Sequence, residues 1–297
     1  MEKALFHLCT NENHSDIFIS EYDFRTAINI MALCLSLFNG LELYSFEFMS
    51  NHLHMLISGS RDEIDSFFRL YVKTLSKFFR AENNPKDLSD LSYSCHIVET
   101  PVHLQNVIVY IHRNASVVDG KISPYTYKWG TGRYYFNPEA RARYDANRKK
   151  VTLNQRQLFS HSRKFDDVSG LYMVDNYISP LSFCKSEEGE RLFTGPGKYL
   201  YMLAKNVESS KSIASEIGER IMYNDYELYP VLVKKAVELF GANNLMSLTS
   251  GQKLRLAKDL HYDYNSGNKQ ICRLLKIDIS VVNELFPQKT LKSLTKI

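Results

Sequence analysis

The first 130 residues alternate short β-type patterns with longer α-type patterns of hydrophobic positions. Apolar side chains recur every three or four residues in three segments, which predicts amphipathic helices at about 20–38, 62–80 and 102–116. Shorter apolar and aromatic runs predict strands at 4–10, 41–49, 52–58 and 93–99. The order βαββαβα is that of a ferredoxin-like fold, so we predict an α+β protein with an antiparallel sheet and helices on one face.

The rest of the chain has a different pattern. Residues 131–170 form a basic, aromatic connector, which begins just after Trp129. Residues 171–297 read as a mostly α-helical domain, with helices predicted at 196–206, 212–222, 231–240, 252–264, 269–275 and 279–286. Thr249 and Gln252 have the spacing of a capping box, and the short turn before the last helix suggests a helix-turn-helix within 250–286. A purely structural three-helix core is the alternative.

Composition narrows the class of protein without identifying a function. The chain has 297 residues, of which 44% are hydrophobic and 24% charged, as in ordinary globular proteins. Its most apolar stretch, 28–38, is too short to span a membrane, and the N-terminus lacks the layout of a secretory signal. The five cysteines are scattered and never form a CxxC pair, so we expect a reducing, cytoplasmic setting without disulfides.

Charge is concentrated in two zones. The net charge is only +4, yet residues 141–164 hold eight basic residues against one acidic residue, and 241–297 hold nine against four. Such zones favour a polyanionic partner, DNA or RNA, although a solvated connector and a soluble helix face would look the same. The candidate DNA-binding residues are Arg141, Arg143, Arg148, Lys149, Lys150 and Arg156.

Two short motifs carry the candidate chemistry. His52 and His54 are two apart on a predicted strand, so both imidazoles face one side and form a plausible half-site for a divalent metal. Tyr110 and Asn114 are four apart on a predicted helix, which places a phenol beside an amide. The alternative to a functional site is that the histidines only form hydrogen bonds and that the tyrosine ring only packs in the fold.

Together these motifs resemble those of the single-tyrosine HUH transposases, in particular the REP-associated branch. The resemblance covers about residues 5–129 and rests on FMSNHLHMLI (48–57), YIHRN (110–114) and YKWGT (127–131). It implies that His52, His54 and Asn114 hold Mg²⁺ or Mn²⁺ and that Tyr110 is the nucleophile. It also implies that residues 1–130 are the catalytic domain of a transposase that cleaves and rejoins single-stranded DNA through a 5′-phosphotyrosine.

The same resemblance implies single-stranded or hairpin DNA as the partner, a homodimer and a nucleoid-associated location in the cytoplasm. The chain departs from the family's pattern after Asn114, where Ala115 and Ser116 replace proline and valine, and at Gly130 and Thr131, which replace two serines. The base that activates Tyr110 is left open, with His103 and His112 as guesses. Two rival functions are a domesticated DNA-binding protein without transposition activity and an RNA-associated module.

Overall fold

The computed structural model describes residues 4–10, 16–86, 88, 91–114, 123–204, 223 and 225–287. It divides into two compact units, Met1–Lys205 and Asn206–Ile297, which are treated separately below. No helix in the described ranges is both long enough and apolar enough to cross a membrane. All five cysteines are free thiols, as expected.

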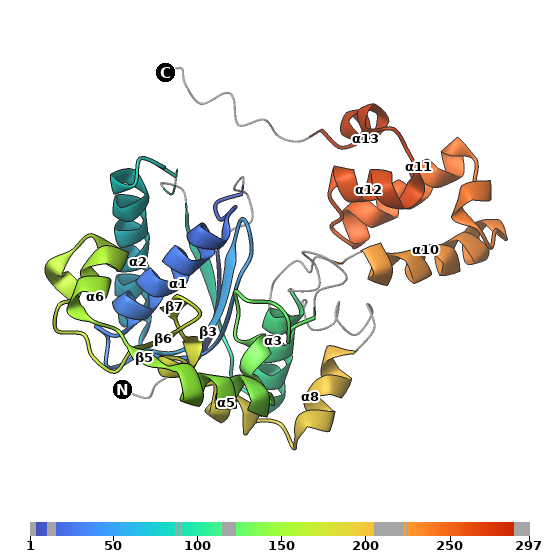
Figure 1. The fold of residues 1–297 in the computed structure, drawn as a ribbon. Helices are drawn as coiled ribbons and strands as arrows, with labels where there is room; N and C mark the ends of the chain where they lie inside the picture. Colours follow the sequence, from blue (N-terminus) through green and yellow to red (C-terminus); the bar gives the residue numbers. More distant parts are fainter. Residues whose placement is uncertain are drawn as a thin grey trace. The chain divides into compact units, whose positions relative to one another are not determined.

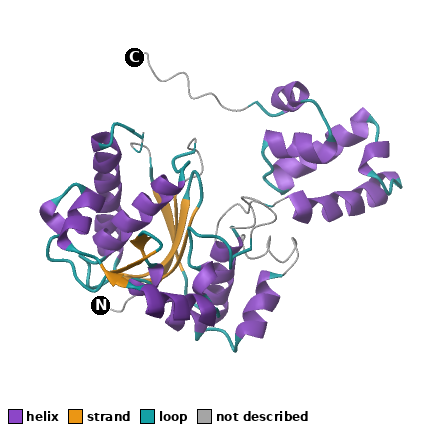
Figure 2. Cartoon of the chain, viewed as in Figure 1, coloured by secondary structure: helices purple, strands orange, loops and turns teal. Residues whose placement is uncertain are grey.

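The first unit is built on a four-stranded antiparallel sheet. Its strands β1 (Ala4–Thr10), β2 (Glu42–Phe48), β3 (Leu53–Gly59) and β4 (Tyr93–Ile97) lie in the order β2-β3-β1-β4. Helix α1 (Glu21–Leu35) joins β1 to β2, and α2 (Arg61–Ala81) joins β3 to β4. This order confirms the predicted ferredoxin-like α+β fold (Figures 1 and 2).

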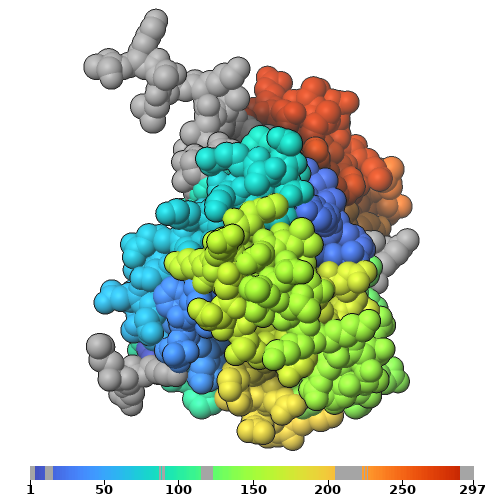
Figure 3. Space-filling view, turned by 60° about the vertical axis from the view of Figure 1, so that its left-hand side comes forward, coloured from blue at the N-terminus to red at the C-terminus, as the bar shows by residue number. Residues whose placement is uncertain are grey.

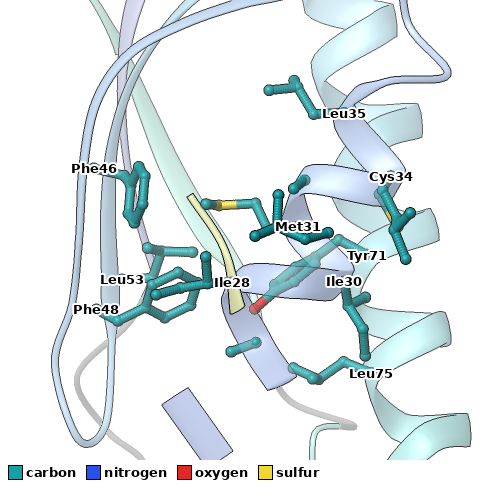
Figure 4. Close-up of a cluster of buried hydrophobic side chains, with 14 of the residues drawn as sticks. Ile28, Ile30, Met31, Cys34, Leu35, Phe46, Phe48, Leu53, Tyr71 and Leu75 are labelled. Carbon is teal, nitrogen blue, oxygen red and sulfur yellow. The ribbon is translucent and has the colours of Figure 1, made fainter. Parts of the chain in front are cut away.

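The main core lies between the sheet and helices α1 and α2. Phe46, Phe48 and Leu53 reach it from β2 and β3, and Ile28 and Tyr71 reach it from the two helices (Figure 4). Ser20 begins α1 with the reciprocal hydrogen bonds of a capping box, which satisfy the backbone N–H groups of Ser20 and Asp23. Burial of this apolar face is the main driving force for the fold.

Helix α3 (Pro101–Arg113) lies on the opposite face of the sheet, against β2 and β3 (Figure 1). Helices α1 and α2 cover one face and α3 covers the other, so the prediction that the helices lie on one face is wrong for α3, whose apolar side packs on the face that carries His7 and His54. Thr100 caps α3 by accepting from the backbone N–H of His103, and Pro101 starts the helix where no N–H is needed. Residues 115 and 116, at the end of the predicted helix, lie outside the described ranges.

Residues 123–204 complete the first unit rather than linking two domains. Phe165 and Ile178 are fully buried in the core cluster with α1, and helix α6 (Leu153–Ser160) packs against α1 and α2 (Figure 3). The unit thus continues past residues 130 and 170, where the sequence pattern sets boundaries. The additional elements are α5 (Pro138–Asn147), β5 (Lys149–Lys150), α6 (Leu153–Ser160), β6 (Tyr172–Val174), β7 (Tyr177–Ile178), α7 (Ser186–Glu190), α8 (Pro196–Leu203) and three-residue 3-10 helices at Gly132–Tyr134, Arg163–Phe165 and Pro180–Ser182.

This segment also covers the β2 edge of the sheet. The backbone of Phe48 donates to Trp129, and the backbone of Thr131 donates to Phe46. Further along, Lys185 donates to the carbonyl of Leu43. An edge strand with unpaired backbone groups invites pairing with other chains, and these hydrogen bonds remove that exposure.

The second unit is helical, as predicted. It contains α10 (Asp225–Phe240), α11 (Ser250–Asp263), α12 (Asn268–Leu275), α13 (Ile279–Leu285) and a 3-10 helix at Leu245–Ser247. The capping box of Thr249 and Gln252 is present. Lys276 takes a left-handed conformation that ends α12, and Asp278 caps α13 two residues later. The helix predicted at 212–222 lies outside the described residues.

Candidate active site

The two histidines of the HLH motif lie together at the start of β3. Their rings are 4.9 Å apart between centroids and nearly perpendicular, while Leu53 between them points into the main core. This is the alternation expected of a strand. His54 is fully buried and His52 is 3% exposed, so the pair lies beneath the surface, on the face of the sheet that α3 covers.

Helix α3 brings Tyr110 to this pair. The Tyr110 ring lies 5.3 Å from that of His54 in an edge-to-face arrangement, and the side chain is 4% exposed. Val107 and Ile111, on the buried side of α3, are almost fully inaccessible and hold the helix against the sheet. A strand and a helix more than fifty residues apart in sequence thus place two imidazoles and a phenol in one cluster.

Asn114 lies at the end of the same helix but does not join the histidines. Its amide Nδ2 donates to the carbonyl of Tyr110 at 3.1 Å, and among the described residues it has no hydrogen bond to His52 or His54. The side chain caps its own helix in this arrangement. A metal-ligating role for Asn114 therefore requires its amide oxygen, which that hydrogen bond leaves available.

A third imidazole, that of His7, belongs to the cluster and was not singled out from the sequence. His7 lies on the central strand β1, and its ring stacks on that of His54 with centroids 5.5 Å apart and planes 13° from parallel. Its Nε2 is 3.4 Å from Nδ1 of His54, and its ring meets that of Tyr110 edge to face. The available signal was a histidine on the polar side of a strand expected to pair with β3.

Burial keeps these imidazoles neutral. It lowers the pKa of His52 to about 4 and holds the pKa of His54 well below its ordinary value, with the charges of His52 and His7 acting in the same direction. Burial, reinforced by His96 and His103, lowers the pKa of His7 to about 3. Neutral imidazole is the form that binds metal ions, so the chemistry of the pair suits a divalent cation.

The two imidazoles alone form only part of a metal site. No cluster of three or more histidine, cysteine, aspartate or glutamate side chains in the described part of the chain is arranged to hold a metal. Imidazole nitrogen is a ligand for many divalent transition metals, whereas Mg²⁺ and Mn²⁺ favour oxygen, so oxygen atoms from an amide, water or phosphate would have to complete the shell for either of these ions. The two imidazoles therefore fit a metal ion whose remaining ligands are oxygen atoms of a bound molecule or of water.

His112 has a different environment from the one guessed for a base. Its Nε2 lies 2.9 Å from the hydroxyl of Ser45 and 3.0 Å from that of Thr131, while Nδ1 lies 2.8 Å from the hydroxyl of Tyr199. Burial lowers the pKa of His112 to about 3. Both ring nitrogens are occupied on the side of α3 that faces β2 and α8, so His112 joins helices and sheet and is not placed to take a proton from Tyr110.

Most of the six candidate DNA-binding residues have partners within the protein. Arg141 contacts Glu187 and Glu190, Arg143 pairs with Asp175, and Arg148 pairs with Asp145. The remaining arginine donates to backbone carbonyls of residues 151 and 166. By contrast, Lys149 and Lys150 are exposed on β5, with no ion pair to any described residue.

Comparison with known proteins adds one remote likeness. No family model and no curated protein matches the chain. A solved structure described as the REP-associated tyrosine transposase bound to a REP hairpin is similar with a TM-score of 0.34 and 15% identity, over 45% of this chain and 78% of that one. A TM-score this low does not identify the family, so the function below rests on the residues of the site.

Proposed function

We propose that this protein is a metal-dependent transposase that cleaves and rejoins single-stranded DNA with Tyr110 as the nucleophile. The observation that carries the proposal is the contact of Tyr110 with His54, 5.3 Å between ring centroids, in a chain where His52 lies 4.9 Å from His54. The YIHRN and HLH motifs of the resemblance are thus adjacent in space.

The chemistry is a transesterification. The phenolic oxygen of Tyr110 attacks a phosphodiester phosphorus, the bond to the 3′ oxygen breaks, and the products are a 5′-phosphotyrosine and a free 3′-hydroxyl. Attack by that hydroxyl in the reverse sense rejoins DNA, so no nucleotide cofactor is consumed. A divalent ion held by His52 and His54, with Asn114 as the proposed third ligand, would polarise the phosphate and offset its charge.

Affinity for DNA would come from other parts of the chain. In the basic zone, Lys149 and Lys150 have the exposure that phosphate contacts need, whereas Arg141 and Arg156 are engaged with Glu190 and with backbone carbonyls. In the second unit, the short turn between α12 and α13 suits a helix-turn-helix, with α13 as the helix that would contact DNA.

The alternative is a domesticated DNA-binding protein of the same fold without transposition activity. One observation favours it: His52, His54, Tyr110 and Asn114 are all less than 5% exposed. A phosphodiester reaches Tyr110 only if neighbouring groups move aside. A binding protein would need no such opening.

The test is covalent capture. Single-stranded DNA with flanking hairpins, incubated with the full chain and Mn²⁺, should give an SDS-resistant adduct that is absent in excess chelator. Tyr110→Phe should abolish the adduct, whereas Tyr201→Phe, at an exposed tyrosine of α8, should leave it intact. Adduct formation by Tyr110→Phe at the wild-type level would refute the assignment, and hairpin binding without any adduct would establish the alternative.

A further inference from the structure

A groove with an apolar floor lies between helix α2 and the residues that lead into β4 (the α2 groove). Its volume is about 470 Å³. Phe68 and Val72 contribute to the floor from α2, and Leu88 and Leu91 contribute from the segment before β4. Phe68 and Leu88 are each 3% exposed, so the floor belongs to the packed interior of the first unit.

Basic side chains line the same groove. Arg69, Lys73 and Arg80 are spaced by four and seven residues, which places them on one exposed stripe of α2. Arg69 and Arg80 donate to serine hydroxyls of their own helix, and none of the three has an ion pair with any described residue. Lys86 also lines the groove but pairs with Asp23. Like charges one turn apart destabilise a helix, so this stripe suits an anionic ligand better than it suits the helix itself.

The α2 groove and the histidine pair lie near the same end of the sheet. Tyr93, the first residue of β4, packs on Phe68 of the groove floor with ring centroids 4.5 Å apart. Tyr93 lies opposite Thr10 of β1, and the hydroxyl of Thr10 accepts from the backbone N–H of Leu53, which separates the two histidines. A short chain of contacts around the end of the sheet therefore connects the groove with the proposed active site.

We propose that the α2 groove binds unpaired DNA next to the cleavage point, with phosphates at Arg69, Lys73 and Arg80 and a base on the apolar floor. The inference rests on the proposed function and deepens it, because it adds a binding surface outside the motifs of the resemblance. The helix rises about 16 Å between residues 69 and 80, which is the length of roughly five stacked nucleotides.

The apolar floor favours a single strand over a duplex. The cations alone would suit either form, since both carry phosphates. The bases of a duplex are stacked inside it and cannot reach the floor, whereas unpaired bases pack on the side chains of a basic groove. A groove that combines three unpaired cations with an apolar floor therefore fits the unpaired part of the substrate rather than a hairpin stem.

Two labelled hairpins test the cations, one blunt and one with a long unpaired flank. Binding is measured in the Tyr110→Phe background, so that no strand is cut. Addition of Arg69→Ala/Lys73→Ala/Arg80→Ala should weaken binding of the flanked hairpin and reduce the slope of log K against log salt by about 0.7 per lost contact, or about 2 in all. Binding of the blunt hairpin should not change. Alanine is a strong helix former, so the variant should keep α2 intact.

Lys77→Ala is the matched control. Lys77 is an exposed cation of the same helix, but it faces α6 and donates to the carbonyl of His161. The substitution removes one positive charge from α2 outside the groove. It should therefore leave both the affinity for the flanked hairpin and the salt slope unchanged.

The apolar floor has its own test, because an abasic flank removes the bases and keeps every phosphate. A base that packs on the protein contributes about 5- to 100-fold in affinity, so the abasic flank should bind more weakly by that factor at every salt concentration. Val72→Ser, at a half-buried floor residue, should reduce this difference without changing the salt slope.

The outcomes separate the two proposals. An unchanged salt slope in the triple variant would make the stripe a solvated face of α2 and overturn the inference. Equal losses for the blunt and flanked hairpins would assign the cations to the stem and overturn it as well, as would equal affinities for the normal and abasic flanks. If the groove binds the flank as expected but the wild-type chain forms no adduct at Tyr110, the proposed function is wrong and the binding groove stands.

Discussion

Replacing Tyr199 with phenylalanine should destabilise the first unit through the tyrosine helix. The Tyr199 hydroxyl lies 2.8 Å from Nδ1 of His112, and both side chains are fully buried. Tyr199→Phe removes that hydroxyl and keeps the ring, which packs against Tyr135 and Phe193. The change therefore isolates one hydrogen bond between α8 and α3.

The size of the destabilisation depends on the ring nitrogen of His112 that loses its hydrogen-bond partner. A buried hydrogen bond contributes about 0.5–1.5 kcal/mol, but a buried nitrogen left without a partner costs about 1–3 kcal/mol. Because no water can replace the hydroxyl at a fully buried nitrogen, the second figure applies, and we expect a loss of about 2 kcal/mol. For a unit of this size each kcal/mol lowers the melting temperature by about 2–4 °C, so the expected shift is about 4–8 °C.

The chain provides its own probe for this measurement. Trp129 is the only tryptophan and stacks on Phe24 of α1, so its fluorescence reports unfolding of the first unit alone. Tyr201→Phe, on the same helix at a position 66% exposed, is the matched control and should change stability by no more than about 0.5 kcal/mol. Equal melting temperatures for the two variants would show that the hydrogen bond does not hold α3.

Two further predictions concern charge. Lys149→Ala/Lys150→Ala should weaken binding to single-stranded DNA and reduce the slope of log K against log salt by about 0.7 per lost contact. Lys198→Ala, at an exposed lysine of α8, should leave that slope unchanged. Equal slopes in the wild type and both variants would remove β5 from the proposed DNA-binding surface. Since burial lowers the pKa of His112 from 6.5 to about 3, its contribution to stability is complete above pH 6.5 and is lost as the pH falls toward 3, at up to about 1.4 kcal/mol per pH unit. Denaturation of wild type and His112→Asn between pH 7 and 4 gives the free energy of unfolding as a function of pH. The slope of that curve should be smaller in the variant by the equivalent of one proton. Identical slopes would contradict the low pKa assigned to His112.

Local patterns predicted most elements of the fold because their signals are complete within a few residues. The capping residues Ser20 and Thr249 begin α1 and α11, where the sequence places them. The small sheet of β5, β6 and β7 was missed, since its strands are two or three residues long and have no periodicity to detect. Its strands are held by contacts with residues distant in sequence. For example, the side-chain oxygen of Asn29 in α1 accepts a hydrogen bond from the backbone N–H of Ile178 at 2.7 Å.

The site shows the same division between local and long-range information. The proximity of His52 and His54 follows from strand geometry alone, and their contact with Tyr110 fits the motifs of the resemblance. The position of His7 depends on the register of β1 against β3, which sets Cys9 opposite His54 and so puts His7 next to His54 on the same face of the sheet. No pattern within β1 reveals that register.

Gly130 and Thr131 have a structural role in the same packing. A Cβ on Gly130 would lie 2.8 Å from a carboxylate oxygen of Glu47 and 3.1 Å from the carbonyl of Phe46, so a larger residue there would require the Glu47 side chain and the β2 edge to shift. Thr131 then places its hydroxyl 3.0 Å from both Ser45 and His112. Residues 127–131 therefore join the edge of the sheet to the helix of Tyr110, and Thr131 helps to fix the position of that helix through His112.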